Sequence, residues 1–349
     1  MQPKTRSSSF VSKARGTAGL SLVELMVAVT IGLLVLLAMT ALLSQQNRAR
    51  EELGKSAAQN ENGRYALTLL QNELQHAGYY GQFDGTGPAP AALPDPCATG
   101  AVAIDEAMGF PVQGYDSPGA VPAPLSACLV DANHVPGTDI LVVRRLSTAD
   151  PLQIPADDLV AARMYAQTTP FERIVDVGAD ESVFTLRQKN PAVFAEIRPV
   201  VTHIYFISPC DVFAAPATSC TAAADGGSPI PTLKRLELGL NAAGARAFVL
   251  TPLVQGIEDL QFDYGVDTDG AGAPATPFIT APTLAQWPDV MAIGVTLRAR
   301  NTEPTQGYTD TKTYDMGVTA AAAGPFNDRF KRHVYSTIVR LNNPSGRRE

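Results

Sequence analysis

An uncharged apolar segment near the N-terminus constrains this chain more than any other feature. The run from Leu25 to Leu43 contains no charged residue. Its length is close to the ~20 residues that an α-helix needs to cross a bilayer. It is longer than the apolar core of a secretory signal peptide, and helix-forming residues follow it instead of a cleavage signal. The sequence therefore predicts a membrane-spanning helix, preceded by four cationic side chains, Lys4, Arg6, Lys13 and Arg15.

The charge of the whole chain excludes one class of partner. The 349 residues include 27 Lys and Arg against 34 Asp and Glu, which gives a net charge of −7. An acidic chain lacks the clustered cations that phosphate contacts require, so we expect no nucleic-acid partner. With 45% hydrophobic and 17% charged residues, the chain has enough apolar side chains for a sizeable core.

The residues at the start of the apolar run form a specific pattern. Gly19-Leu20-Ser21-Leu22-Val23-Glu24-Leu25-Met26 resembles the class III signal of type IV pilins and type II secretion pseudopilins. The resemblance implies that a prepilin peptidase cuts between Gly19 and Leu20, removes residues 1–19 as a leader peptide, and leaves a mature N-terminus at Leu20 that is methylated. Leu20 departs from the family pattern, in which Phe or Met is commoner at this position. This difference affects the expected efficiency of cleavage by the prepilin peptidase.

Glu24 lies at the membrane end of the predicted helix. A carboxylate there costs a few kcal/mol unless it is paired, so it is a candidate functional residue. Cleavage would create an ammonium group four residues away, at Leu20. We expect Glu24 to pair with the Leu20 ammonium of a neighbouring subunit and so to fix the axial register of packed helices. The alternative is an interfacial glutamate that reaches water without a partner.

The helix is predicted to continue beyond the membrane. No proline occurs between Pro3 and Pro88, and apolar residues recur at spacings of three and four after the apolar run. We therefore predict a membrane half over residues 20–43 and an amphipathic half over residues 44–78, where Gly78 ends the helix. The predicted apolar face consists of Ala57, Ala58, Ala66, Leu67, Leu70, Leu74 and Ala77, and the predicted polar face includes Gln59 and Glu73.

Residues 79–349 are predicted to form a β-rich globular domain. Residues 79–137 are rich in Gly, Pro and Ala and indicate a long ordered loop. Several later segments are rich in β-branched and aromatic residues, and some alternate between apolar and polar positions. The predicted fold is α+β, a long N-terminal helix packed on an antiparallel β-sheet head with long loops. The predicted strands are Ile140–Arg145, Ser182–Gln188, Val200–Ser208, Leu233–Leu240, Leu253–Val266, Val290–Ala299 and Val334–Leu341.

Three C-terminal segments carry a second resemblance. Gly256–Asp267, Trp287 with the strand that ends at Arg300, and Phe330–Thr337 are similar to the PilW group of minor pilins. The resemblance implies a pilin-like structural subunit that helps to initiate and cap a type IV pilus. Its implied partners are other minor pilins, the major pilin, a PilY-type tip protein and the prepilin peptidase. Residues 253–300 are also similar to J-type minor pseudopilins of type II secretion, which is the first alternative. A membrane-anchored periplasmic enzyme or binding domain is the second.

Four cysteines, Cys97, Cys128, Cys210 and Cys220, follow the predicted span. None forms a CxxC pair, so redox and zinc-ribbon chemistry have little support. We expect two disulfides in an oxidising periplasm. Of the three connectivities we favour the sequence-local one, Cys97–Cys128 and Cys210–Cys220, over the alternative of free buried thiols. The cysteines and the peptidase site indicate a single-pass inner-membrane protein with a cytoplasmic N-terminus, a periplasmic domain and later incorporation in a pilus.

Residues with catalytic potential are scattered along the chain. The four histidines lack a metal-binding spacing, and no phosphate loop or nucleophile elbow is present. Asp267-Thr268-Asp269-Gly270 resembles the start of a calcium loop but lacks the ligands that should follow, so we predict a solvated hairpin turn. We therefore predict no enzymatic activity, no cofactor and no metal site.

Overall fold

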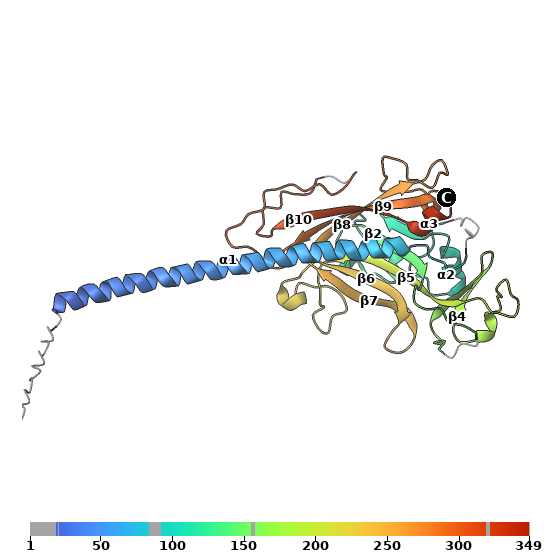
Figure 1. The fold of residues 1–349 in the computed structure, drawn as a ribbon, viewed down its shortest axis with the longest axis horizontal. Helices are drawn as coiled ribbons and strands as arrows, with labels where there is room; N and C mark the ends of the chain where they lie inside the picture. Colours follow the sequence, from blue (N-terminus) through green and yellow to red (C-terminus); the bar gives the residue numbers. More distant parts are fainter. Residues whose placement is uncertain (1–18, 20, 84–91, 155–157, 319–321, 349) are drawn as a thin grey trace, which may run out of the picture. The chain divides into compact units, whose positions relative to one another are not determined.

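A computed structural model describes residues 19, 21–83, 92–154, 158–318 and 322–348. Most of the predicted leader and Leu20 lie outside these residues. The chain divides into two compact units, residues 1–54 and 55–349. The helix α1 (Leu22–His76) begins in the first unit and ends in the second, as the blue ribbon in Figure 1 shows. One helix from before the apolar run to His76 agrees with the sequence prediction.

The second unit combines the C-terminal part of α1 with ten strands and two short helices among the described residues. The helices are α2 (Ala101–Ala107) and α3 (Asn342–Gly346). The strands are β1 (Val112–Tyr115), β2 (Ile140–Leu146), β3 (Met164–Thr168), β4 (Arg173–Val177), β5 (Ile197–Ser208), β6 (Thr232–Leu240), β7 (Arg246–Gln255), β8 (Ile257–Val266), β9 (Val290–Arg300) and β10 (Arg332–Arg340).

The strands form two antiparallel sheets. The larger has seven strands in the order β1-β2-β5-β3-β4, with β6 on β5 and β7 on β6. The strand β5 pairs with three others because it is 12 residues long: its start pairs with β3, and its end pairs with β6. The smaller sheet has the order β10-β9-β8. The predicted fold, a long helix on an antiparallel sheet head, is confirmed.

Gly256 separates the two sheets. The sequence predicts one strand over Leu253–Val266, but the structure has β7 in the larger sheet and β8 in the smaller. Gly256 has a φ of +77°, and a Cβ there would lie 2.7 Å from the carbonyl oxygen of Arg300. Only glycine tolerates both the backbone conformation and this close approach, so the chain changes sheet here.

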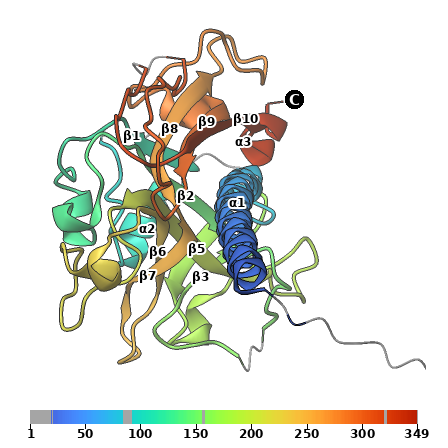
Figure 2. The same cartoon turned by 90° about the vertical axis from the view of Figure 1, so that its left-hand side faces the viewer.

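The C-terminal part of α1 packs on both sheets (Figures 1 and 2). Its buried stripe follows helical spacing and consists of Gln59, Gly63, Ala66, Leu70 and Leu74, and the buried Ala77 directly after the helix continues it. It joins one hydrophobic core with Tyr205 on β5, Leu233 on β6 and Leu297 on β9. The predicted face was wrong at its N-terminal end, since Ala57 and Ala58 are exposed. Gln59 is buried in their place, because its side-chain amide donates hydrogen bonds to the carbonyl oxygens of Ala299 and Lys331.

Other differences from the predicted elements have local causes. The region predicted as loop, 79–137, contains α2 and β1. The segment Ser182–Gln188 is not a strand: it begins with a 3₁₀ turn, Glu181–Val183, capped by the Asp180 carboxylate, which accepts the backbone N–H of Ser182. The strands β3 and β4 were not predicted. All of β3 is buried, so its residues show no alternation for sequence analysis to detect.

Asp139 ties the two sheets together. It precedes β2, and its Oδ2 accepts the backbone N–H of Phe262 on β8 at 2.7 Å. Its Oδ1 accepts the backbone N–H of Ser117, also at 2.7 Å. Burial raises the pKa of Asp139 to about 7, although these hydrogen bonds oppose the shift.

Candidate functional site

The first unit presents an apolar helix with no packing partner in the described residues. Every large apolar side chain from Leu22 to Leu43 is at least 50% exposed. This stretch of α1 is long and apolar enough to cross a membrane. Its two threonine hydroxyls are satisfied locally, since Thr30 and Thr40 donate to the carbonyl oxygens of Val27 and Leu37. The surface therefore requires either lipid or other helices to cover it.

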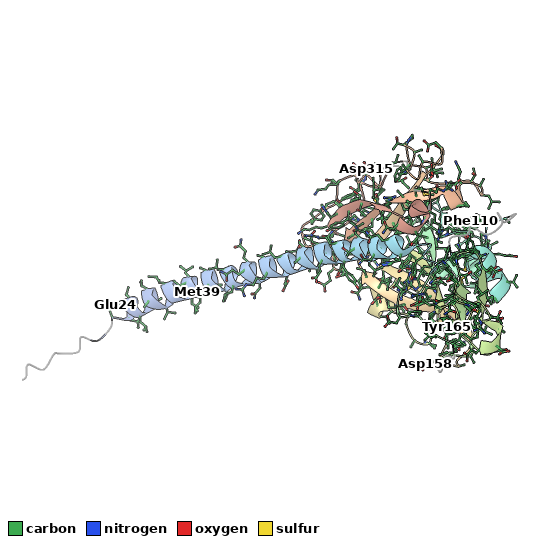
Figure 3. The ribbon with its side chains drawn as sticks, turned by 45° about the vertical axis from the view of Figure 1, so that its right-hand side comes forward. Glu24, Met39, Phe110, Asp158, Tyr165 and Asp315 are labelled. Atoms are coloured by element: carbon green, nitrogen blue, oxygen red, sulfur yellow. A yellow bond between two sulfur atoms is a disulfide. The ribbon has the colours of Figure 1, made fainter. Side chains whose placement is uncertain are left out.

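Glu24 lies in the first turn of α1. Its side chain is exposed and extends away from the helix, as does that of Met39 (Figure 3). Gly19 is also exposed, and Leu20 lies outside the described residues. The predicted cleavage position and the predicted Glu24 pairing thus stay predictions, but the carboxylate is placed where a neighbouring chain can reach it.

A cluster of charged residues locks the C-terminal part of α1 to β5. The Oε1 atom of Glu73 lies 3.0 Å from Nε of Arg145 and 2.9 Å from Nδ1 of His203. The other imidazole nitrogen of His203 lies 3.7 Å from Oε2 of Glu237 on β6, and Arg235 contacts the same carboxylate. The cluster is built from one helix and three strands of the larger sheet, β2, β5 and β6.

This cluster shifts the pKa values of both carboxylates. Burial raises the pKa of Glu73, but the hydrogen bonds and charges of His203 and Arg145 outweigh it and lower the pKa to about 2. The hydrogen bond from His203 is the main cause that lowers the pKa of Glu237 to about 2. Both groups are therefore ionised at neutral pH, and the Glu73 carboxylate holds the helix to Arg145 and His203.

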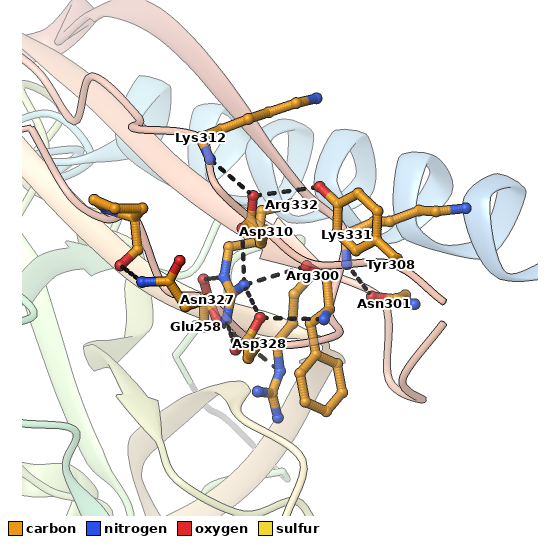
Figure 4. A network of polar contacts seen from close by, with 12 residues as sticks. Glu258, Arg300, Asn301, Tyr308, Asp310, Lys312, Asn327, Asp328, Lys331 and Arg332 are labelled. Atoms are coloured by element: carbon orange, nitrogen blue, oxygen red, sulfur yellow. Dashed lines mark hydrogen bonds and ion pairs between the residues drawn. The ribbon is translucent and has the colours of Figure 1, made fainter. Parts of the chain in front are cut away.

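A second cluster, which we call the Arg332 clamp, fixes the connection between β9 and β10. Arg332 bonds Glu258 at 2.5 Å, Asp310 at 2.9 Å and Asp328 at 2.6 Å (Figure 4). Asp310 is fully buried and also accepts the hydroxyl of Tyr314 at 2.9 Å. The acids hold the pKa of Arg332 above its ordinary value. The clamp thereby ties Asp310 and Asp328 of this connection to the smaller sheet.

The clamp lies beside the point where α1 enters the second unit. The Nε2 atom of Gln59 donates to the carbonyl oxygens of Ala299 and Lys331, which flank this connection. Nearby, Nζ of Lys55 lies 3.4 Å from Oε2 of Glu303. Sequence analysis missed both the clamp and the Glu73 cluster. Their residues are charged side chains far apart in the sequence, a pattern that is equally typical of a solvated surface.

Both disulfides join cysteines that are near in sequence. The bonds are Cys97–Cys128 and Cys210–Cys220, each with Cα atoms 5.7 Å apart. This is the favoured connectivity. Cys210 is fully buried, and the backbone N–H of Cys220 donates to the side chain of Asn133. The second disulfide therefore holds the loop between β5 and β6 against the larger sheet.

The described residues contain no group of three or more His, Cys, Asp or Glu side chains arranged to hold a metal ion. The predicted hairpin turn at residues 267–270 is wrong. Asp267 begins the long connection from β8 to β9 and is nearly buried. Its carboxylate accepts the backbone N–H groups of Gly270 and Gly272 and the guanidinium of Arg348. It thereby organises the connection and the C-terminal end of the chain.

Comparison with known proteins connects this geometry to a family. Residues 220–343 match the model of the family described as Type IV Pilus-assembly protein W. This region of the chain is PilW-like. The predicted resemblance to the PilW group is confirmed over these residues, which include strands β6 to β10 and every acidic partner in the Arg332 clamp.

Two further comparisons add nothing to this family evidence. A type IV-like pilin from Thermus thermophilus aligns with 14% sequence identity over 82% of this chain and 96% of its own, with a TM-score of 0.32. No curated protein sequence matches the chain. The PilW-like region therefore provides the family evidence, which indicates a protein related to the type IV pilus.

Proposed function

We propose that this chain is a minor pilin, a structural subunit that helps to initiate assembly of a type IV pilus and to cap it. In this proposal a prepilin peptidase removes residues 1–19, and the new N-terminus at Leu20 is methylated. The protein is held in the inner membrane with residues 79–349 in the periplasm. Its partners are other minor pilins, the major pilin and a PilY-type tip protein.

The exposed apolar surface of α1 between Leu22 and Leu43 carries this proposal. A lone anchor needs only apolar residues, and an acid near its end costs free energy. A subunit that leaves the membrane for a helical bundle needs the same apolar surface together with a means of setting axial register. Glu24 at the start of the surface supplies a charge for that purpose, and the PilW-like region supplies the family context.

The second unit adds a contact surface of its own. The face of α1 opposite the buried stripe exposes Ala57, Ala58 and Tyr65. An exposed tyrosine on a helix face suits packing against a neighbouring subunit, because aromatic residues are enriched in protein interfaces. The Glu73 cluster and the hydrogen bonds of Gln59 hold this part of α1 on the sheets, so a neighbour would meet a fixed surface.

Processing and incorporation test the proposal together. We expect protein produced with a prepilin peptidase to lose residues 1–19 and gain one methyl group by intact mass. We also expect the processed form in sheared pili of the producing cells. Gly19→Val provides the matched control, since it should block cleavage without changing the apolar run. Retention of residues 1–19 would overturn the proposal. Processed protein that never appears in pili would instead favour a secretion pseudopilin.

A further inference from the structure

A groove of about 560 Å³ opens on the outer face of the smaller sheet. Its position follows from the register of the three strands. Asp263 on β8 pairs with Gly294 on β9, which pairs with Ile338 on β10. In the next row, Thr296 on β9 pairs with Ser336 on β10. Gly294 has no side chain, so the row formed by Asp263, Gly294 and Ile338 has a gap above β9. This gap forms the floor of the groove.

One wall of the groove is aromatic. Phe278, from the connection between β8 and β9, packs over the sheet at Gly265, where a Cβ would lie 2.8 Å from Cε1 and Cζ of the ring. A Cβ at Gly294 would be in ordinary contact with the same ring, 3.8 Å from Cδ2. Two glycines on adjacent strands thus let the ring lie close to the sheet, beside the floor of the groove.

The other side of the groove is acidic. Asp263 is 5% exposed, and its Oδ2 accepts the backbone N–H of Val318 at 3.1 Å. Gly317 makes this contact possible, because a Cβ there would lie 2.7 Å from the same oxygen. Asp315 also lines the groove, and none of the lining residues is Lys, Arg or His. The charge of the groove therefore disfavours an anionic ligand.

Of the hydroxyl side chains that line the groove, those of Thr296 and Ser336 lie in the row next to the glycine floor. No hydrogen bond in the described part of the chain engages the side-chain oxygen of Thr296 or Ser336, although Thr296 is 7% exposed. A hydroxyl group in such a place can donate to a ligand and accept from it. The groove thus combines an aromatic ring, a fixed carboxylate and two available hydroxyls, within the volume range of ~300–1,000 Å³ of small-ligand sites.

We propose that this groove binds a saccharide, with one sugar ring stacked on Phe278 and its hydroxyl groups bonded to Asp263, Thr296 and Ser336. A sugar ring has an apolar face of C–H groups and a rim of hydroxyls, which matches an aromatic wall beside polar groups. Hydrogen bonds from sugar hydroxyls to a carboxylate are charge-assisted and are the stronger kind. This binding activity is separate from pilus assembly and does not depend on it.

The test uses the full chain in a detergent without sugar headgroups, such as lauryldimethylamine oxide, because glycoside detergents would compete. Maltotriose, triacetylchitotriose and lactose are titrated, and binding is followed by calorimetry and saturation-transfer NMR. We expect saturable binding of at least one of them, with a Kd of about 1 mM. Phe278→Ala should weaken it about tenfold or more, equivalent to the loss of one stacking contact.

Ser336→Ala keeps the strand intact and removes one hydroxyl, so it should weaken binding severalfold even if Phe278→Ala fails to fold. Phe171→Ala is the matched control, since Phe171 is a 90% exposed phenylalanine on the turn between β3 and β4 of the other sheet. It should bind as the unaltered protein does. Failure of all three saccharides to bind would overturn the proposal. The proposal would also be overturned if neither Phe278→Ala nor Ser336→Ala changed saccharide binding. The same holds if a lysine-rich peptide bound and no saccharide did.

Discussion

Oε1 of Glu73 on α1 lies 2.9 Å from Nδ1 of His203 on β5. The contact joins the helix to the central strand of the larger sheet, in a place where sequence analysis expected a solvent-facing glutamate. His203 in turn contacts Glu237, and Arg145 contacts Glu73, so the helix is held by charges as well as by its apolar stripe. The attachment of α1 to the head should therefore depend on pH.

The Glu73 contact predicts acid sensitivity. The pKa of Glu73 is about 2 in the folded protein and 4.5 ordinarily, so its stabilising effect is full above about pH 4.5 and is lost as pH falls toward 2. At pH 7, Glu73→Gln should lower the free energy of unfolding by roughly 3 kcal/mol. It should also flatten the acid limb of a stability-against-pH curve measured by denaturant titration. Glu61→Gln, on the exposed face of α1, is the control, and an equal effect there would contradict the argument.

Asp139 predicts a pH effect of opposite sign. Its folded pKa of about 7 lies above the ordinary 3.8, so the folded state retains a proton that the unfolded state has released. Stability should then fall as pH rises from about 4 to 7. Asp139→Asn should abolish this slope, and it should cost ~1–3 kcal/mol, because an amide N–H₂ would face a backbone N–H of Ser117 or Phe262. An unchanged slope in thermal unfolding of the variant would exclude Asp139 as its source.

Gly63 predicts an unusual response to alanine. Alanine within a helix normally stabilises by up to ~1 kcal/mol relative to glycine. At Gly63, however, the added Cβ would overlap the ring of Tyr335 on β10. Gly63→Ala should therefore destabilise the second unit by ~1–3 kcal/mol. Gly54→Ala in the same helix has no atom within 4 Å of the added Cβ, so it should be neutral or stabilising. Equal behaviour of the two variants in thermal unfolding would show that the Tyr335 contact is unimportant.

The sequence predicted elements whose pattern is set by their own residues. The long helix was recognisable because its apolar run and its lack of proline are local properties. The strands β2, β5, β6 and β9 were recognisable because β-branched residues alternate or cluster within them. The disulfide pairing also agreed with expectation, since the cysteines of each pair are close in sequence.

The missed features depend on contacts between distant residues. Gln59 is buried because carbonyl groups of Ala299 and Lys331 lie within its reach, about 240 and 270 residues later. Gly256 breaks a strand because the backbone of Arg300 approaches it. The Arg332 clamp requires acids from three separate segments. Polar residues at such positions look solvent-facing in a sequence, and only the folded chain shows which of them meet.

Because Cys210 and Cys220 form one disulfide, we expect replacement of either cysteine to lower stability by the same amount. Cys210→Ser should lower the free energy of unfolding by ~2–5 kcal/mol. Cys220→Ser should have the same effect, and the double variant should be no worse, because each change breaks the same bond. Thiol labelling of unfolded, unreduced protein should detect no free cysteine. Four labelled thiols would contradict the pairing.

In the proposed function Glu24 sets the axial register of this subunit within a pilus, and the recovery of a Glu24→Ala variant in sheared pili is the measurement that tests this role. Without the carboxylate, the ammonium group of a neighbour's Leu20 is left uncompensated among apolar helices, a loss of ~3–5 kcal/mol for each contact. Membrane insertion should persist, because the span becomes more apolar. We expect cleaved protein that stays in the inner membrane, with pili that are fewer or lack the variant. Normal piliation with normal recovery of Glu24→Ala in the sheared fraction would contradict it.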